Sequence, residues 1–155
     1  MSKTPTTRPP RDPDYERRVR KSFEGQPAMS RLFGAKMVSV APGTTEIHIP
    51  LQPDFMQQMG NVHGGIIGAL ADSAAGYAAL TLLEVGQEVV TVEYKINFVA
   101  PAFGDLLIGR GHVVRAGRTL HVCVAEIFAR RAGEETLVAY MTTTMMVVAD
   151  PKHGK

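Results

Sequence analysis

The longest apolar segment of the chain covers residues 64–83 and reads GGIIGALADSAAGYAALTLL. It is rich in alanine and glycine and shows no alternation of polar and apolar residues, so it predicts an α-helix of about five turns. Little polar surface interrupts it apart from Asp72, Ser73 and Thr81. A helix that is apolar on nearly all sides is normally surrounded by other structure. The sequence therefore predicts a helix buried at the centre of the fold.

A β-hairpin is predicted before this helix. Residues 36–40 form its first strand, and Ala41-Pro42-Gly43 supplies the turn. In the second strand Ile47, Ile49 and Leu51 alternate with more polar positions, which is the period of two expected when one face of a strand is buried.

The part of the chain after the helix has the patterns of β-strands. Long runs rich in β-branched residues, with short glycine-containing breaks between the later ones, predict four strands in a meander. These strands cover residues 91–98, 106–115, 119–131 and 136–148. An antiparallel sheet curled round one buried helix accounts for the whole order, so the predicted fold class is α+β.

The N-terminal part is expected to be less regular. Residues 1–12 are polar and proline-rich and predict a disordered lead, which leaves residues 13–150 as a single domain. Within that domain, residues 14–23 predict a short amphipathic helix and residues 27–33 a further helical turn.

Composition narrows the classes of function. The chain has 155 residues, of which 45% are apolar and 21% charged, and its net charge of +2 gives no case for nucleic acid binding. Its one cysteine, Cys123, excludes an internal disulfide, and apolar neighbours favour a buried core thiol over a nucleophile. The histidines and Cys123 lack the spacing of metal ligands, so no metal site is predicted.

Nothing in the sequence predicts export or membrane insertion. The N-terminal segment lacks the apolar run that a secretory signal needs. Residues 66–83 approach the length of a membrane span, but Asp72 and many small residues favour a buried helix. A cytoplasmic protein is expected.

The start of the predicted helix carries a chemical hypothesis. His63-Gly64-Gly65 lies where a loop becomes a helix, and the first N–H groups of a helix are unpaired and lie at the positive end of its dipole. Glycine lets a ligand approach the backbone closely. The N–H of Gly64 or Gly65 could therefore stabilise an oxyanion. The alternative is a glycine-rich helix start that only eases packing.

A carboxylate within the apolar helix is the second candidate. Burying Asp72 without a partner or a purpose is costly, which favours a base or nucleophile; the alternative is a structural aspartate bonded to backbone or to Ser73. Asp72 lies eight residues after Gly64, roughly 12 Å along the helix axis. One substrate carbonyl cannot comfortably contact both groups of one helix. An antiparallel helix in a two-fold dimer brings them together, so composite sites are predicted.

Taken together, these motifs resemble a known family. The hotdog-fold acyl-CoA thioesterases of the phenylacetate-degradation (PaaI-like) type are similar to this chain at Gly60-Asn61-Val62-His63-Gly64-Gly65 and the following Leu70-Ala71-Asp72-Ser73-Ala74. Residues 91–102 and the turn Gly117-Arg118-Thr119 resemble later parts of the family. The likeness spans residues 28–148. It implies a hotdog fold, in which an antiparallel sheet wraps around one long central helix, and hydrolysis of an acyl-CoA.

The resemblance implies a role for each candidate. Asp72 would be the general base or nucleophile, Gly64 would be the oxyanion donor, and His63 would shape the loop. Gln57 stands where the family often has asparagine and would orient the water or hold the substrate carbonyl; a solvated loop glutamine is the alternative. Thr91 would help to position the water.

The resemblance also implies substrate contacts and an assembly. Asn61 and Gly65 would bind the substrate, and Arg118 and Thr119 lie in a turn that would meet the CoA phosphates; a solvated arginine is the alternative. CoA is part of the substrate, so no cofactor is expected. The expected homodimer would pair into a homotetramer, and neither nucleic acid nor a membrane is an expected partner.

Two other functions stay open. A hotdog dehydratase or hydratase would pair a loop histidine with a helix carboxylate, as His63 and Asp72 could, although the proline-glycine context of the dehydratase histidine is absent. A non-catalytic acyl-CoA-binding module would have no need of Asp72. The acyl group is left open between aromatic and short or medium chains, with Met56 and Met59 indicating an adaptable apolar surface.

Overall fold

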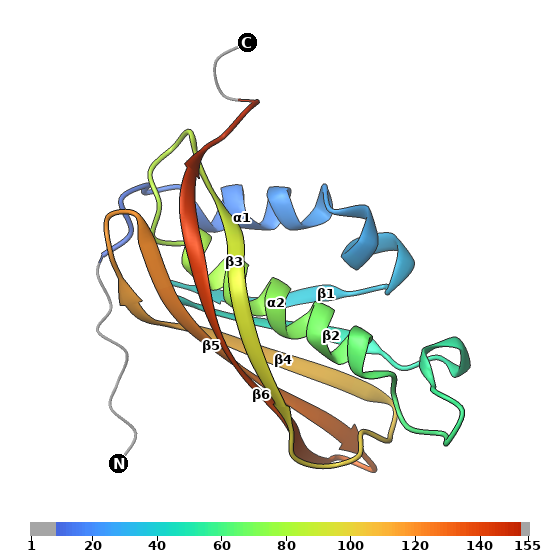
Figure 1. Cartoon of the computed structure of the whole chain (residues 1–155). Coiled ribbons are helices and arrows are strands. Elements are labelled where there is room, and N and C mark those ends of the chain that lie inside the picture. Colours follow the sequence, from blue (N-terminus) through green and yellow to red (C-terminus); the bar gives the residue numbers. More distant parts are fainter. Residues whose placement is uncertain (1–8, 153–155) are drawn as a thin grey trace.

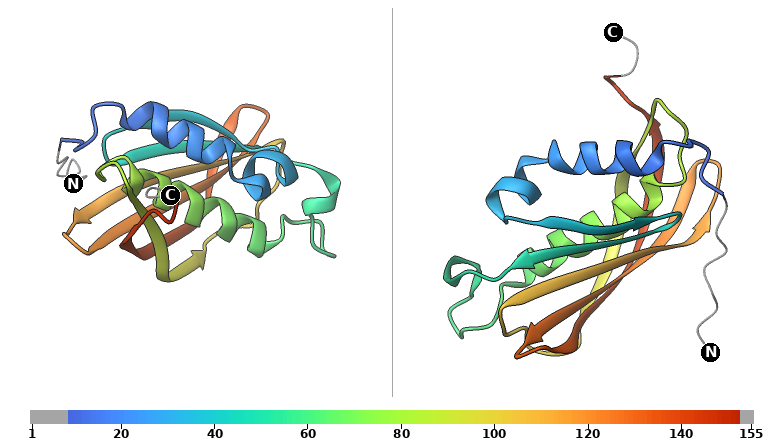
Figure 2. Two further views of the ribbon diagram at one scale, coloured as in Figure 1. Left: turned by 90° about the horizontal axis from the view of Figure 1, so that it is seen from above. Right: turned by 180° about the vertical axis from the view of Figure 1, so that it is seen from behind.

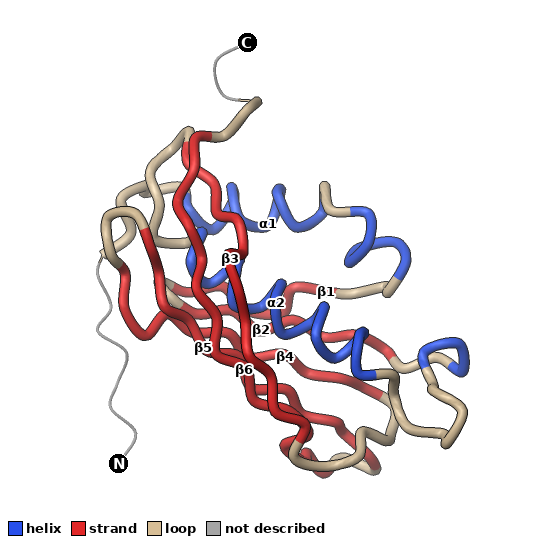
Figure 3. The backbone as a smooth tube through the Cα atoms, viewed as in Figure 1, coloured by secondary structure: helices blue, strands red, loops and turns tan. Residues whose placement is uncertain are grey.

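A six-stranded sheet curves around the long helix α2 (Figure 1). The computed structural model describes residues 9–152, and all neighbouring strands in it pair antiparallel. The helices are α1 (Tyr15–Glu24), the π-helical turn η1 (Ala28–Leu32), the 3-10 turn η2 (Pro53–Phe55) and α2 (Gly64–Leu80). The strands are β1 (Lys36–Ala41), β2 (Thr44–Pro50), β3 (Gln87–Phe98), β4 (Leu106–Ala116), β5 (Leu120–Arg131) and β6 (Glu134–Ala149). The predicted α+β class, with a sheet wrapped around one helix, is confirmed (Figure 3).

The order of the strands in the sheet is β1-β2-β4-β5-β6-β3. The predicted meander is right for β4, β5 and β6 and wrong for β3, which pairs with β6 along its whole length and not with β4. The chain crosses the sheet through α2 and adds β3 at the far edge, so β3 and β4 are consecutive in sequence but distant in the sheet. The other edge of β3 has no neighbouring strand among the described residues.

Close approach to the sheet holds α2 in place. A Cβ atom at Gly109 of β4 would lie 2.7 Å from Leu70 Cγ, and one at Gly111 would overlap the Ala74 carbonyl. Only glycine at these two positions lets the helix lie this close. Thr45 Oγ1 also donates a hydrogen bond of 2.7 Å to the Ala74 carbonyl oxygen. The face of α2 that carries Leu70 and Ala74 therefore packs on β2 and β4. The face that carries Asp72 points away from these two strands.

The predicted helix over residues 64–83 ends earlier, at Leu80. Thr81 is fully buried, and its Oγ1 donates to the Ala78 carbonyl and accepts from the Gly43 N–H, both at 2.7 Å. Residues 81–83 stay buried although they leave the helix. Apolar composition therefore marked the buried segment but not the point where the helix stops.

The N-terminal helix α1 lies alongside β1 and packs on α2 (Figure 2). Its apolar positions Val19 and Phe23 are buried, as the amphipathic pattern predicts. The Phe23 ring meets the Tyr77 ring of α2 edge-on, with 5.4 Å between ring centroids. Through this contact α1 packs beside the C-terminal part of α2.

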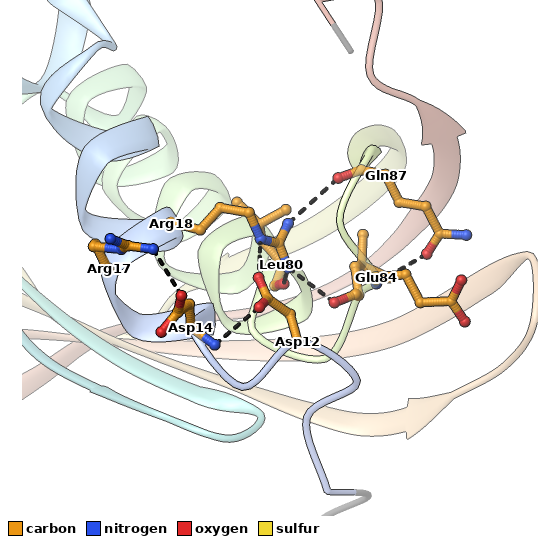
Figure 4. A network of polar contacts seen from close by, with 8 residues as sticks. Asp12, Asp14, Arg17, Arg18, Leu80, Glu84 and Gln87 are labelled. Atoms are coloured by element: carbon orange, nitrogen blue, oxygen red, sulfur yellow. Dashed lines mark hydrogen bonds and ion pairs between the residues drawn. The ribbon is translucent and has the colours of Figure 1, made fainter. Parts of the chain in front are cut away.

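A polar network ties α1 to the C-terminal end of α2 (Figure 4). Arg18 donates a hydrogen bond of 3.4 Å to the carbonyl oxygen of Leu80, the last residue of α2. It donates a second, of 2.8 Å, to the carbonyl oxygen of Leu83, which follows the helix. It also pairs at 2.7 Å with Asp12, which is only 4% exposed. Burial raises the pKa of Asp12, but hydrogen bonds and the charge of Arg18 outweigh it and leave that pKa below its ordinary value. The pair's contribution to stability is therefore present above about pH 4 and is lost as the pH falls through the lowered pKa.

Replacing Arg18 should destabilise the fold far more than replacing its neighbour. We expect Arg18→Ala to lower the free energy of unfolding by about 3 kcal/mol, because it leaves Asp12 buried without its counter-charge. The matched control is Arg17→Ala, because Arg17 makes a pair with Asp14 in which the arginine side chain is 81% exposed; we expect less than about 1 kcal/mol there. Urea unfolding at one protein concentration measures both. Equal losses in the two variants would contradict a supporting role for the network.

Residues 1–8 of the predicted disordered lead lie outside the described residues. Beyond them, Arg11 pairs with Glu84 at 2.7 Å, and Asp12 belongs to the network above. Among the described residues 9–152, no helix has the length and hydropathy needed to cross a membrane.

Candidate active site

The N-terminus of α2 is shaped by the loop before it. The His63 N–H donates to the Phe55 carbonyl at 2.8 Å, and the Val62 N–H donates to the Ala102 carbonyl at 3.1 Å. His63 then caps the helix, because its Nδ1 accepts the Gly65 N–H at 2.9 Å. Within residues 9–152 the Gly64 N–H donates to no protein group. Of the two glycines considered from the sequence, Gly64 therefore has the N–H available to a ligand.

The ring of Phe98, at the end of β3, lies over Gly64. A Cβ atom built on Gly64 would be 3.0 Å from Phe98 Cζ, tighter than ordinary van der Waals contact. The Phe98 side chain is itself 54% exposed. An aromatic surface therefore borders the free N–H, and a larger residue at position 64 would have to displace this ring.

Gln57 and Asn61 close a tight turn in the same loop. The Gln57 N–H donates to the Asn61 carbonyl at 2.7 Å, and Gln57 Oε1 accepts the Met59 N–H at 2.6 Å. The side-chain oxygen of Gln57 is thus used inside its own turn in this chain. Asn61 Oδ1 is buried without a hydrogen-bond partner among the described residues.

Asp72 is half-buried on α2 and meets β3. Thr91 Oγ1 donates a hydrogen bond of 2.7 Å to Asp72 Oδ1 and lies 3.4 Å from Met145 Sδ. The structure thus brings together two of the predicted site residues, and Thr91, not Ser73, is the hydroxyl on this carboxylate. One Asp72 oxygen is oriented by Thr91, and the other makes no hydrogen bond among the described residues.

A β-bulge explains how Thr91 reaches Asp72. Uninterrupted alternation along β3 would place Thr91 and Tyr94 on opposite faces of the strand, but the strand does not alternate uniformly. The register of β3 against β6 shifts between Thr91 and Glu93, so that Thr91 pairs with Met145 and Tyr94 with Thr143. Since Met145 and Thr143 share one face of β6, Thr91 and Tyr94 share the inner face of β3.

A cavity of about 220 Å³ opens beside Asp72. Besides Asp72 and Thr91, its lining includes Tyr77 of α2, Glu88 of β3 and Gln26 between α1 and η1. Sequence reasoning missed these last three residues. No spacing signal pointed to Tyr77, because five residues turn it about 140° round α2 from Asp72. Tyr77, Gln26 and Glu88 all reach the cavity only through tertiary packing.

The structure places the other predicted binding residues away from Gly64. Arg118 is exposed in the turn between β4 and β5 and lies near Leu82 and Leu83, which follow the C-terminal end of α2. Thr119 is exposed in the same turn, and its carbonyl accepts the Val147 N–H at 2.8 Å. Within one chain, therefore, Gly64 and Arg118 lie near opposite ends of α2, with Asp72 between them.

The surroundings of Cys123 do not favour nucleophilic chemistry. Cys123 is fully buried on β5, and burial raises the pKa of its thiol to about 12. The thiolate needed for nucleophilic attack is thus strongly disfavoured. Residues 9–152 contain no group of three or more His, Cys, Asp or Glu side chains placed to hold a metal ion.

Comparison with known proteins gives consistent matches. The thioesterase superfamily model matches residues 59–136. The solved structure of a thioesterase family protein from Silicibacter pomeroyi is 42% identical, with a TM-score of 0.85, and the match covers 88% of this chain and 99% of that one. A phenylacetic acid degradation-related protein from Ralstonia eutropha is 29% identical, with a TM-score of 0.72, over 85% of this chain and 98% of that one. Acyl-coenzyme A thioesterase 13 of Homo sapiens is 27% identical over 63% of this chain and 70% of that protein.

Proposed function

This chain belongs to the thioesterase superfamily and has the hotdog fold of its PaaI-like members, and we propose that it hydrolyses an acyl-CoA to the free acid and CoA. The observation that carries the proposal is the Asp72 carboxylate, which accepts a hydrogen bond from Thr91 and lines a cavity beside the central helix. The relative acyl-coenzyme A thioesterase 13 is named for acyl-CoA substrates, which supports CoA as the thiol that the proposed reaction releases.

The complete site requires two chains. Gly64 and Asp72 lie roughly 12 Å apart along one helix, too far for a single carbonyl group. We propose a homodimer in which the free edges of two β3 strands pair about a two-fold axis and two α2 helices run antiparallel. This places Asp72 of one protomer next to Gly64 of the partner subunit.

The edge of β3 supports this assembly. An unpaired edge strand is a template for pairing with another chain. Here it also carries apolar side chains that this chain leaves uncovered: Val92, Tyr94 and Phe98 are 54%, 49% and 54% exposed. A dimer through this edge would cover them. Two such dimers would form the expected homotetramer, although the site needs only the dimer.

The proposed chemistry uses the groups already in place. Asp72 either takes a proton from a water that attacks the thioester carbonyl or attacks that carbonyl itself to give an anhydride that water then hydrolyses. In both routes the carbonyl oxygen becomes an oxyanion that accepts the N–H of the partner subunit's Gly64, and the C–S bond breaks to release CoA. Thr91 fixes the carboxylate through its hydrogen bond. No cofactor is needed, because CoA arrives as part of the substrate.

The remaining predicted residues take peripheral roles in this proposal. His63 accepts the Gly65 N–H and leaves the Gly64 N–H available to the substrate. Gln57 and Asn61 shape the loop against which the thioester carbonyl of the substrate would lie. An antiparallel dimer brings the Arg118 turn, near the C-terminal end of α2, toward the partner's helix N-terminus. Arg118 and Thr119 would there be placed to meet the phosphates of CoA.

A panel of acyl-CoAs tests the function. We expect the purified protein to release CoA with saturable kinetics and a kcat on the order of 1–10 s⁻¹ on its best substrate, detected with a thiol reagent. The panel should include acetyl-, hexanoyl-, palmitoyl- and phenylacetyl-CoA, plus an enoyl-CoA for hydratase activity. Failure to release CoA from every member would contradict the proposal. Binding of intact acyl-CoA would then indicate a binding module, and hydration of the enoyl-CoA a hydratase.

A further inference from the structure

The hydroxyl of Tyr94 lies against α2 at Gly68. A Cβ atom built on Gly68 would be 3.9 Å from Tyr94 Oη. Gly68 is four residues after Gly64 and four before Asp72, so the three share one face of the helix, with about 6 Å along the axis between neighbours. Strand β3 passes over this face (Figure 1). Tyr94 therefore places a hydroxyl one helical turn from each of the two groups proposed for the chemistry.

This hydroxyl makes no hydrogen bond among the described residues, whereas the nearby hydroxyls are in use. Thr91 donates its one proton to Asp72 Oδ1. Thr143, which pairs with Tyr94 from β6, donates its own to the Glu93 carbonyl oxygen. The Tyr94 side chain is 49% exposed in the single chain, and in the proposed dimer the partner strand would cover it. A covered hydroxyl needs a hydrogen-bond partner.

The spacing suits one water molecule between Tyr94 and Asp72. Two hydrogen bonds through one water oxygen span about 5.5 Å, close to the rise of about 6 Å that separates Gly68 from Asp72. Asp72 has one carboxylate oxygen without a hydrogen bond among the described residues. Such a water would donate one hydrogen to that oxygen and the other to Tyr94 Oη, which leaves a lone pair free to attack a carbonyl.

We propose that Tyr94 is a positioning residue that holds the attacking water for Asp72. This inference rests on the proposed acyl-CoA hydrolysis and selects, of its two routes, the one in which Asp72 is a general base. The water oxygen bonds to the thioester carbon as its proton passes to Asp72, and the carbonyl oxygen takes the negative charge. When the oxyanion reforms the carbonyl, the C–S bond breaks and the sulfur of CoA takes that proton from Asp72.

A contact between two copies of Tyr94 is the alternative. Gly68 is the midpoint of Gly64 and Asp72, so a two-fold axis that pairs these groups between chains passes near it. Tyr94 Oη and the same atom of the partner's Tyr94 would then bond only to each other. In that arrangement the hydroxyl stabilises the dimer and has no part in the reaction, so the two roles predict different kinetics.

Tyr94→Phe tests the inference, because it removes the hydroxyl and no hydrogen bond present in the chain. On the best acyl-CoA of the panel we expect kcat to fall about tenfold or more and KM to change less than about twofold, since the water and not the substrate loses its partner. In an Asp72→Asn background the same substitution should lower kcat by less than about twofold, because groups that act as a unit are not additive. Tyr140→Phe, on the outer face of β6, is the matched control and should keep the natural kcat.

Three results would overturn the inference and leave the proposed function in place. The first is a Tyr94→Phe protein with the natural kcat. The second is an equal fold loss from Tyr94→Phe in the natural and Asp72→Asn backgrounds, which would make the role structural. The third is dissociation of the Tyr94→Phe dimer on gel filtration where the natural dimer persists, which supports the contact between the two hydroxyls. A natural protein that releases CoA from no acyl-CoA contradicts the proposed function itself.

Discussion

Asp72→Asn should reduce kcat/KM for the best acyl-CoA substrate by about a hundredfold or more, the usual scale for removing a positioned base or nucleophile. Asparagine keeps the size of the side chain and can still accept the hydrogen bond from Thr91 Oγ1. It cannot take the proton of an attacking water, nor attack a thioester carbonyl. The loss should therefore appear mainly in kcat, which steady-state release of CoA measures directly.

The control for Asp72→Asn is the same substitution at an aspartate outside the cavity. Asp105 is 66% exposed and lies 3.6 Å from Arg130, so Asp105→Asn should leave kcat/KM within about twofold of the natural value. Circular dichroism and gel filtration establish that both variants fold and assemble alike. If Asp72→Asn hydrolyses acyl-CoA as fast as Asp105→Asn, Asp72 has no catalytic role.

The sequence predicted those parts of the fold that depend on local pattern. The helix at Gly64–Leu80 follows from its continuous apolar composition, and β2 follows from its period of two, because burial leaves both marks within a single element. The place of β3 at the edge of the sheet did not follow. Strand pairing joins residues far apart in the chain, and the hydrophobic pattern of β3 suits a neighbour on either side.

The same division applies to the candidate site. Asp72 was singled out from the sequence because a carboxylate in an apolar helix is unusual, and Gly64 because it starts that helix and matches the glycine of the family motif. The Asp72–Thr91 contact depends on a bulge that reverses the faces of β3, which alternation alone predicts incorrectly. The choice between Gly64 and Gly65 depends on the rotamer of His63, which fixes which N–H remains free.

Gly64→Pro should abolish most of the activity while leaving the helix intact. Proline has no N–H, so the variant removes the proposed oxyanion donor and no hydrogen bond present in the chain. The first position of a helix favours proline, and His63, with φ −60° and ψ 132°, already has the extended backbone preferred before it. Loss of one oxyanion donor typically lowers kcat by about a hundredfold to a thousandfold.

Gly64→Ala is the matched control for this substitution. Alanine keeps the N–H but brings a Cβ toward Phe98, so it reports the cost of displacing that ring by itself. We expect Gly64→Ala to retain at least about ten times the kcat of Gly64→Pro, because only the latter lacks the donor. Equal losses in the two variants would assign the effect to Phe98 and contradict a role for the N–H.

Mixing the two inactive variants tests whether the groups come from different chains. In a dimer of one Asp72→Asn chain and one Gly64→Pro chain, one of the two composite sites contains both defects and the other contains neither. After the variants are unfolded together at equal concentration and refolded, half the dimers are mixed and each has one intact site, so activity should return to about a quarter of the natural value. If both groups acted within one chain, no mixed dimer would contain an intact site. The mixture would then stay as inactive as its components, and the proposed antiparallel dimer would be wrong.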